Sequence, residues 1–166
     1  MKMLAAPMLA LCALASLSGC GLQPLYAGGS TGVVAQGLAG IEVPAIEGRN
    51  GWLMRNALTD RFGQSGQVTP RYRLDIVLDD NLEALGLLTD DTIGRERRTL
   101  RARYQLVDLN NSAVVIDATA GSDAGIDVVS SEYATISAEQ TAIENLVQEV
   151  ADQITARLSR TLRDTQ

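Results

Sequence analysis

The chain has 166 residues, with 14 basic and 20 acidic side chains and no histidine, and its net charge is −6. This length suits one domain with one substantial core. The absence of histidine removes the most common general base and metal ligand, which disfavours most enzymes that depend on metal-assisted or nucleophilic chemistry.

The N-terminus has the pattern of a lipoprotein signal. Lys2 precedes an apolar run from Met3 to Leu17, and Leu17-Ser18-Gly19-Cys20 has the small residues of a cleavage site before a cysteine. The run is shorter than the roughly 20 residues that span a bilayer. We therefore predict a signal peptide over residues 1–19 and acyl chains on Cys20 that anchor the mature chain to a membrane.

The anchor bears on location and on thiol chemistry. Gly21 stands where aspartate retains many lipoproteins at the inner membrane, so we expect an outer-membrane protein. Cys12 leaves with the signal and Cys20 carries lipid, so no thiol remains for a disulfide, a metal or catalysis. The mature chain keeps 13 arginines against 20 acidic residues. A net-acidic exported protein is a poor match for nucleic acid.

Residues 20–40 are rich in glycine and small side chains, which predicts a flexible tether between the lipid and the domain. The domain would then span residues 41–166. Ile41-Glu42-Val43 alternates and stops at Pro44, as a short edge strand does. A first helix is expected over residues 51–62, with Asn50 as its N-cap and Gly63 just after its end.

Three longer strands are predicted next, because apolar residues occupy every second position in each. Tyr72 to Leu78 begins the first, Arg97 to Leu106 lies in the second, and Val114 to Ala120 forms the third. The Asn- and Asp-rich residues 108–112 indicate a hairpin turn, whereas residues 121–131 show no assignable pattern.

A long amphipathic helix closes the chain. Ser137-Ala138-Glu139-Gln140 fits a capping box, and the apolar positions that follow recur at helical spacing. The element order is therefore β-α-β-β-β-α. Because each strand has one apolar face, we predict an α+β two-layer sandwich, with a small, mainly antiparallel four-stranded sheet and two helices on one face.

A cluster of arginines is the strongest lead to a binding site. Between Arg95 and Arg103 there are five arginines and one glutamate, against an acidic background. Guanidinium groups bind phosphate and carboxylate as planar forks, and alternate strand residues stand about 7 Å apart. The candidates for an anionic ligand are Arg95, Arg97, Arg98, Arg101 and Arg103. Equally, these arginines could pair across strands with Asp75, Asp79 and Asp117.

Carboxylates are the remaining source of catalysis. Asp79-Asp80 and Asp90-Asp91 are adjacent pairs that could perform acid-base chemistry in an envelope hydrolase. Both pairs flank turns, where aspartate is common for local hydrogen bonding. We expect no catalytic residue, no metal and no cofactor.

Several features together resemble the lipopolysaccharide-assembly lipoprotein family, LptE. They are Cys20-Gly21-Leu22-Gln23-Pro24-Leu25-Tyr26, Arg55-Asn56-Ala57-Leu58, the arginine-rich strand to Tyr104, and the closing helix. The most specific is the Pro-Leu-Tyr run close behind the cysteine. Unlike the family's enterobacterial members, the mature chain is acidic overall and has no lysine.

The resemblance implies a non-catalytic lipoprotein in the inner leaflet of the outer membrane, facing the periplasm. Such proteins plug and help assemble a β-barrel partner, LptD, and together the two insert lipopolysaccharide at the cell surface. It further implies contact between basic residues and lipopolysaccharide, for which the five arginines are the matching positions. An auxiliary lipoprotein of another envelope lipid-transport machine is the alternative.

Overall fold

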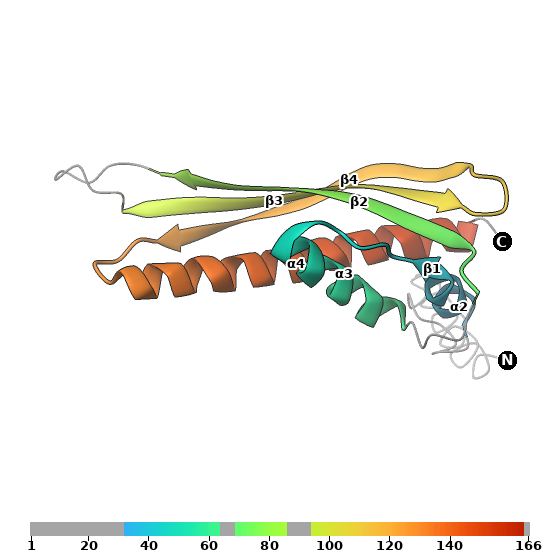
Figure 1. The fold of residues 1–166 in the computed structure, drawn as a ribbon, viewed down its shortest axis with the longest axis horizontal. Helices are drawn as coiled ribbons and strands as arrows, with labels where there is room; N and C mark the ends of the chain where they lie inside the picture. Colours follow the sequence, from blue (N-terminus) through green and yellow to red (C-terminus); the bar gives the residue numbers. More distant parts are fainter. Residues whose placement is uncertain (1–31, 64–68, 86–93, 165–166) are drawn as a thin grey trace, which may run out of the picture.

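The computed structural model describes residues 32–63, 69–85 and 94–164, which form a two-layer α+β sandwich (Figure 1). A twisted sheet makes one layer and helices make the other. The predicted signal peptide and Cys20 lie outside the described residues. No helix among the described residues is long and apolar enough to cross a bilayer.

The sheet has four strands in chain order: β1 (Ile41–Glu42), β2 (Tyr72–Ala84), β3 (Arg95–Asp108) and β4 (Val114–Asp127). β1 runs parallel to β2, while the other neighbours are antiparallel. This confirms the predicted mainly antiparallel sheet and the predicted edge position of the first strand. The fold class and the strand order in the chain are also as expected.

Alternation explains the inner face of the sheet. Leu74 of β2 lies opposite Leu106 of β3, which lies opposite Ile116 of β4, and all three are buried. Side chains of one parity in each strand therefore meet the helices, and those of the other parity face outward.

The turn between β3 and β4 forms as predicted. The Asn110 N–H donates to Asp108 Oδ1 at 2.8 Å, and the Ser112 N–H donates to the Asp108 carbonyl at 2.8 Å. An aspartate side chain that bonds two residues onward is the local reason that such sequences turn.

β4 is longer than the alternating pattern indicated. Its second half covers residues 121–127, part of the segment that had no assignable pattern. Ala124 and Ile126 keep the inward parity of Ile116 and Ala120. Glycine and small polar residues between them hid the strand in the sequence, because strand propensity there is low and β3 supplies the pairing.

The closing helix, α4 (Glu132–Asp164), has 33 residues, about 50 Å at the helical rise. It begins five residues before Ser137, so the predicted capping box is wrong. Ser131 lies at the true start, where its Oγ accepts the Ala134 N–H at 3.4 Å. The first turns are largely exposed and bury no regular apolar stripe, so helical spacing of apolar residues did not reveal them.

The first predicted helix is α3 (Gly48–Phe62). Its N-cap is Glu47 and not Asn50, whose side chain instead donates to Asp80 Oδ2 at 2.8 Å. Gly63 follows the helix in the left-handed region at φ 63°, as predicted for a glycine that ends a helix.

A third helix, α2 (Val33–Ala39), occupies residues that the sequence assigned to the flexible tether. Val34 and Leu38, one turn apart, are both buried. Gly37 packs so closely on α4 that a Cβ there would lie 3.2 Å from Leu162 Cδ1. These residues are part of the domain, because their two apolar side chains complete its core.

The core lies between the inner sheet face and the helices. The sandwich has two ends (Figure 1). We call proximal the end with α2, β1 and the C-terminus of α4, and distal the end where β2 and β4 finish and where β3 and α4 begin. The largest fully buried side chains are Tyr104, Leu38, Ile41, Met54, Leu58, Leu74, Leu100, Leu106, Ile143, Leu146, Ile154 and Leu158.

Candidate functional site

Four of the five candidate arginines share the outer face of the sheet. Arg95, Arg97, Arg101 and Arg103 alternate along β3 with the buried residues, and all four are exposed. The helices cover only the inner face (Figure 1), so these guanidinium groups are accessible to a ligand. We call them the arginine strip.

Three members of the strip pair with aspartates of β4. Arg95 Nε lies 3.2 Å from Asp127 Oδ1, and Arg97 Nε lies 3.8 Å from Asp123 Oδ2. Arg103 Nη2 lies 3.1 Å from Asp117 Oδ2. The predicted cross-strand pairing thus holds for Asp117. The alternation along β4 could have identified Asp123 and Asp127, because they and Asp117 all lie at positions that face the outer side of the sheet.

The other two aspartates proposed as partners behave differently. Asp75 pairs with Arg73 of its own strand, at 2.9 Å between Nη2 and Oδ2. Within the described residues Asp79 forms no ion pair at 4.0 Å or less, although it lies opposite Arg101 in the register. The predicted pairing of the strip with Asp75 and Asp79 is therefore wrong.

The Arg103–Asp117 pair stabilises the charged form of the Asp117 carboxylate. Hydrogen bonds from Arg103, and then from Gln105 at 2.8 Å, lower the pKa of Asp117 from its usual value. The same contact raises the pKa of Arg103. Both side chains are exposed to water, which screens the pair and limits its effect on stability.

Arg101 differs from its neighbours in the strip. In the part of the chain that the structure describes, it forms no ion pair. Its side chain crosses the backbone of Gly121, where a Cβ would lie 2.5 Å from Arg101 Cδ and Nη1. Glycine at position 121 therefore makes room for this side chain, and the guanidinium remains available for an external anion.

Arg98 belongs to the opposite face. Its Nε and Nη2 bind the two oxygens of Asp80 at 2.9 and 2.6 Å, and its Nη1 donates to the Glu139 carbonyl at 3.2 Å. The hydrogen bond to Asp80 raises the pKa of Arg98. Because only 17% of the Arg98 side chain is exposed, we interpret it as a link between sheet and α4.

A shallow hollow of about 270 Å³ adjoins the strip on the outer face. Asp75, Val77, Arg103 and Gln105 line it. Val77 is 72% exposed, so the hollow combines an apolar floor with one charged side chain of each sign. This arrangement can contact an amphipathic anion, but it contains no acid-base pair suited to bond cleavage.

Of the aspartates considered for catalysis, the described pair Asp79-Asp80 is divided between the two faces of the sheet. Successive residues of β2 point to opposite faces, so Asp79 is outward while Asp80 binds Arg98 and Asn50 on the inner side. Asp90 and Asp91 lie outside the described residues. The described residues contain no cluster of three His, Cys, Asp or Glu side chains that could hold a metal.

Comparison with known proteins decides the family. The profile of the family LptE, described as lipopolysaccharide-assembly, matches residues 38–158. The chain belongs to this family. The match covers all three long strands and most of α4, so the domain that carries the arginine strip is a lipopolysaccharide-assembly domain.

Solved structures support the fold. A candidate lipoprotein from Caulobacter crescentus CB15 is 27% identical, with a TM-score of 0.68 over 81% of this chain and 98% of that one. Rare lipoprotein B from Shewanella oneidensis is 11% identical, with a TM-score of 0.59 over 75% and 96%. A minor lipoprotein from Acinetobacter baumannii is 16% identical, with a TM-score of 0.55 over 72% and 88%. No curated protein matches the chain.

Proposed function

We propose that the chain is an outer-membrane lipoprotein that plugs a β-barrel partner of LptD type and helps it assemble for lipopolysaccharide transport and insertion. Membership of the lipopolysaccharide-assembly family over residues 38–158 carries the proposal. In this role Cys20 bears the acyl chains. The anchor lies in the inner leaflet, and the domain faces the periplasm.

The shape and surface of the domain support a role without catalysis. Three strands of 13 or 14 residues lie along a helix of 33 residues, which gives a long two-layer body (Figure 1). Its outer sheet face is charged and self-paired. The lumen of a large outer-membrane barrel is polar, so such a face can lie against it in water.

The arginine strip is the proposed contact for lipopolysaccharide phosphates. Arg101 forms no ion pair among the described residues, so its guanidinium is the first that a phosphate meets. Arg95, Arg97 and Arg103 are held only by exposed pairs, which are typically worth about 0–1 kcal/mol each, so a phosphate can displace their aspartates. Arg98 is excluded because its guanidinium is bound on the inner face.

Co-purification tests the plug. A tagged full-length chain, recovered from detergent-solubilised envelopes of a Gram-negative host, should bring down an outer-membrane barrel of LptD type. Recovery with no barrel would refute the proposal. Depletion separates the alternative: a loss of surface lipopolysaccharide is expected here, whereas unchanged lipopolysaccharide with altered phospholipid distribution would indicate another lipid-transport machine.

Charge reversal tests the strip. Arg101→Glu with Arg103→Glu should weaken lipopolysaccharide binding at least tenfold, because two exposed cations are replaced by anions that repel phosphate. The matched control is Arg157→Glu with Arg160→Glu, which makes the same charge change on the exposed side of α4. Equal losses in both pairs would mean that overall charge, and not the strip, governs binding, as measured by titration with fluorescent lipopolysaccharide.

A further inference from the structure

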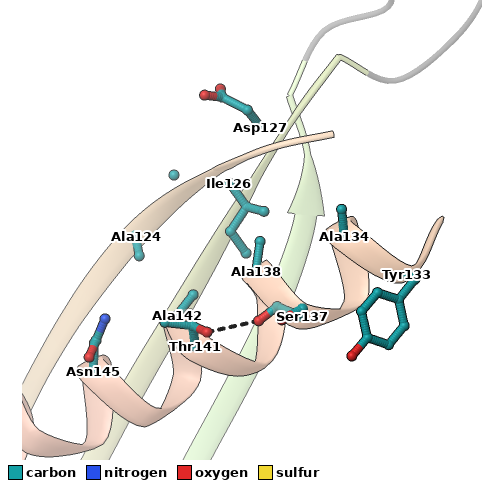
Figure 2. A pocket seen from close by; sticks show the side chains of 11 residues that line it. Ala124, Ile126, Asp127, Tyr133, Ala134, Ser137, Ala138, Thr141, Ala142 and Asn145 are labelled. Atoms are coloured by element: carbon teal, nitrogen blue, oxygen red, sulfur yellow. Dashed lines mark hydrogen bonds between the residues drawn. The ribbon is translucent and has the colours of Figure 1, made fainter. Parts of the chain in front are cut away.

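An open groove lies at the distal end, between the last residues of β4 and the first turns of α4 (Figure 2). Its volume is about 750 Å³. One wall is the free edge of β4 and the other is the helix, and most of the lining side chains are small. The lining residues are Ala124, Gly125, Ile126, Asp127, Tyr133, Ala134, Ser137, Ala138, Thr141, Ala142 and Asn145.

The free edge of β4 has a regular set of backbone hydrogen-bonding groups. Among the residues that the structure describes, β4 is the last strand of the sheet and pairs only with β3. The Val128 N–H just beyond it points back to the Gly94 carbonyl, so even-numbered residues face β3. Odd-numbered residues therefore direct both N–H and C=O away from the sheet.

At Gly121 the chain satisfies one of these outward pairs itself. The Gln153 side chain accepts the Gly121 N–H at 3.3 Å and donates to the Gly121 carbonyl at 3.2 Å. A primary amide that bonds both groups of one residue reproduces what a neighbouring peptide unit does in an antiparallel sheet. This edge of β4 is thus already shown to bind an amide.

The next residues whose backbone groups point away from β3 are Asp123, Gly125 and Asp127. These groups have no such partner among the described residues. The side chains that α4 places beside this edge become shorter toward its start, which explains why α4 supplies no partner there. Glu149, one turn before Gln153, still reaches the neighbouring Ser122 hydroxyl. Further toward the start of α4 this side of the helix carries the shorter side chains of Thr141 and Ser137. The Thr141 hydroxyl donates to the Ser137 carbonyl of its own helix at 2.9 Å (Figure 2).

We propose that the groove binds an extended peptide segment of a partner protein, which adds a strand to β4 along residues 123–127. The backbone N–H and C=O groups of Asp123, Gly125 and Asp127 offer up to six hydrogen bonds. A peptide backbone can form these bonds, whereas an acyl chain cannot. The proposal goes beyond the plug function and does not depend on which barrel is the partner.

The groove also indicates the side chains that such a segment would carry. Residues of the added strand that face the helix would meet Ala134, Ser137 and Ala138, which leave room for aliphatic side chains. Tyr133 at the mouth is 83% exposed and can cover one of them. The carboxylates of Asp123 and Asp127 are paired with arginines on the outer face, so they repel an incoming segment little.

The test selects a peptide and then asks which of its amides matter. A phage library of random dodecapeptides would be panned on the full-length chain in detergent, and the selected peptide measured by fluorescence anisotropy. N-methylation at alternate amides removes donors from one edge only. We expect at least tenfold weaker binding for one alternating set and a change below twofold for the other.

Variants of the chain test whether the selected peptide binds along β4 in the groove. Gly125→Pro removes one outward donor and should weaken binding at least tenfold. Thr119→Pro is the matched control, because Thr119 is an exposed outward residue of the same edge outside the groove, and it should bind within twofold. Ser137→Trp fills the groove without altering the strand and should also abolish binding.

Each other occupant gives a different outcome. Failure to select any peptide whose binding Gly125→Pro weakens would overturn the proposal. Laurate that shifts the Ala138 amide resonance, with equal affinity in both proline variants, would assign the groove to an acyl chain. Concentration-dependent dimers that Gly125→Pro dissociates would assign it to a second copy. Either of these results overturns the partner segment.

Discussion

The proximal and distal halves of the sandwich differ in how the inner face of the sheet is covered. In the proximal half, α2 and α3 lie beside α4, and residues such as Leu38, Leu58 and Leu158 are almost fully buried. α3 begins near Asp80, where Asn50 binds the strand. Beyond that point α4 is the only described helix in the helical layer (Figure 1).

In the distal half, the inner face of the sheet is less fully covered. Leu82, on the inner parity of β2, is 42% exposed, and Ile136 of α4 is 54% exposed. Glu96 Oε2 is buried with no hydrogen-bond partner in the described part of the chain. The proximal half therefore contains most of the buried core, whereas the distal half contains the groove proposed above to bind a peptide segment.

Core deletion should give the largest difference between the halves. Leu158→Ala removes a fully buried side chain of the proximal core and should lower the free energy of unfolding by about 3 kcal/mol. Ile136→Ala, the matched distal truncation, should change it by less than about 0.5 kcal/mol because half of that side chain is already in water. Urea titration measures both, and equal losses would contradict the comparison.

The inner-face ion pair should give the next largest effect. Arg98→Gln breaks the bidentate contact with Asp80 and the bond to the Glu139 carbonyl, so we expect a loss of about 1.5 kcal/mol. Arg101→Gln, three residues away on the outer face, should cost less than about 0.5 kcal/mol. A double-mutant cycle with Asp80→Asn isolates the pair, and zero coupling would show that Arg98 acts only through packing.

The sequence predicted the fold wherever apolar periodicity was strong. The alternation around Leu74 and Leu106 and the helical stripe through Leu158 are local signals that the core enforces. Residues 121–127 were not predicted because their strand is imposed by pairing with β3, while their own side chains, apart from Ile126, are small or polar. α2 was not predicted because its seven residues, of which two are buried, resemble a spacer until they pack against α4.

The candidate site was predicted in part. The outward direction of four arginines follows from parity, and the same rule places Arg98 with Leu100 on the inner face. Parity alone could not identify the aspartates of the pairs, because that depends on the register between β3 and β4. The distal groove could not be predicted from the sequence, because it depends on where α3 begins relative to the sheet.

The smallest expected effect concerns the outer face, where charge changes should alter titration and leave stability nearly unchanged. The Arg103 and Gln105 contacts lower the pKa of Asp117 in the folded chain, so their stabilising contribution is present at neutral pH. It is lost as the pH falls through that lowered pKa. Arg103→Gln should raise the pKa of Asp117 toward its ordinary value, as followed by NMR of the carboxyl carbon.

The control for this titration is Arg101→Gln, which removes an equal charge that makes no contact with Asp117 and should leave the Asp117 midpoint unchanged. Added salt should reduce the difference between wild type and Arg103→Gln, because an exposed pair is screened. An identical midpoint in wild type and Arg103→Gln would show that the pair does not persist in solution. The strip would then present two unpaired guanidinium groups, Arg101 and Arg103, to an incoming phosphate.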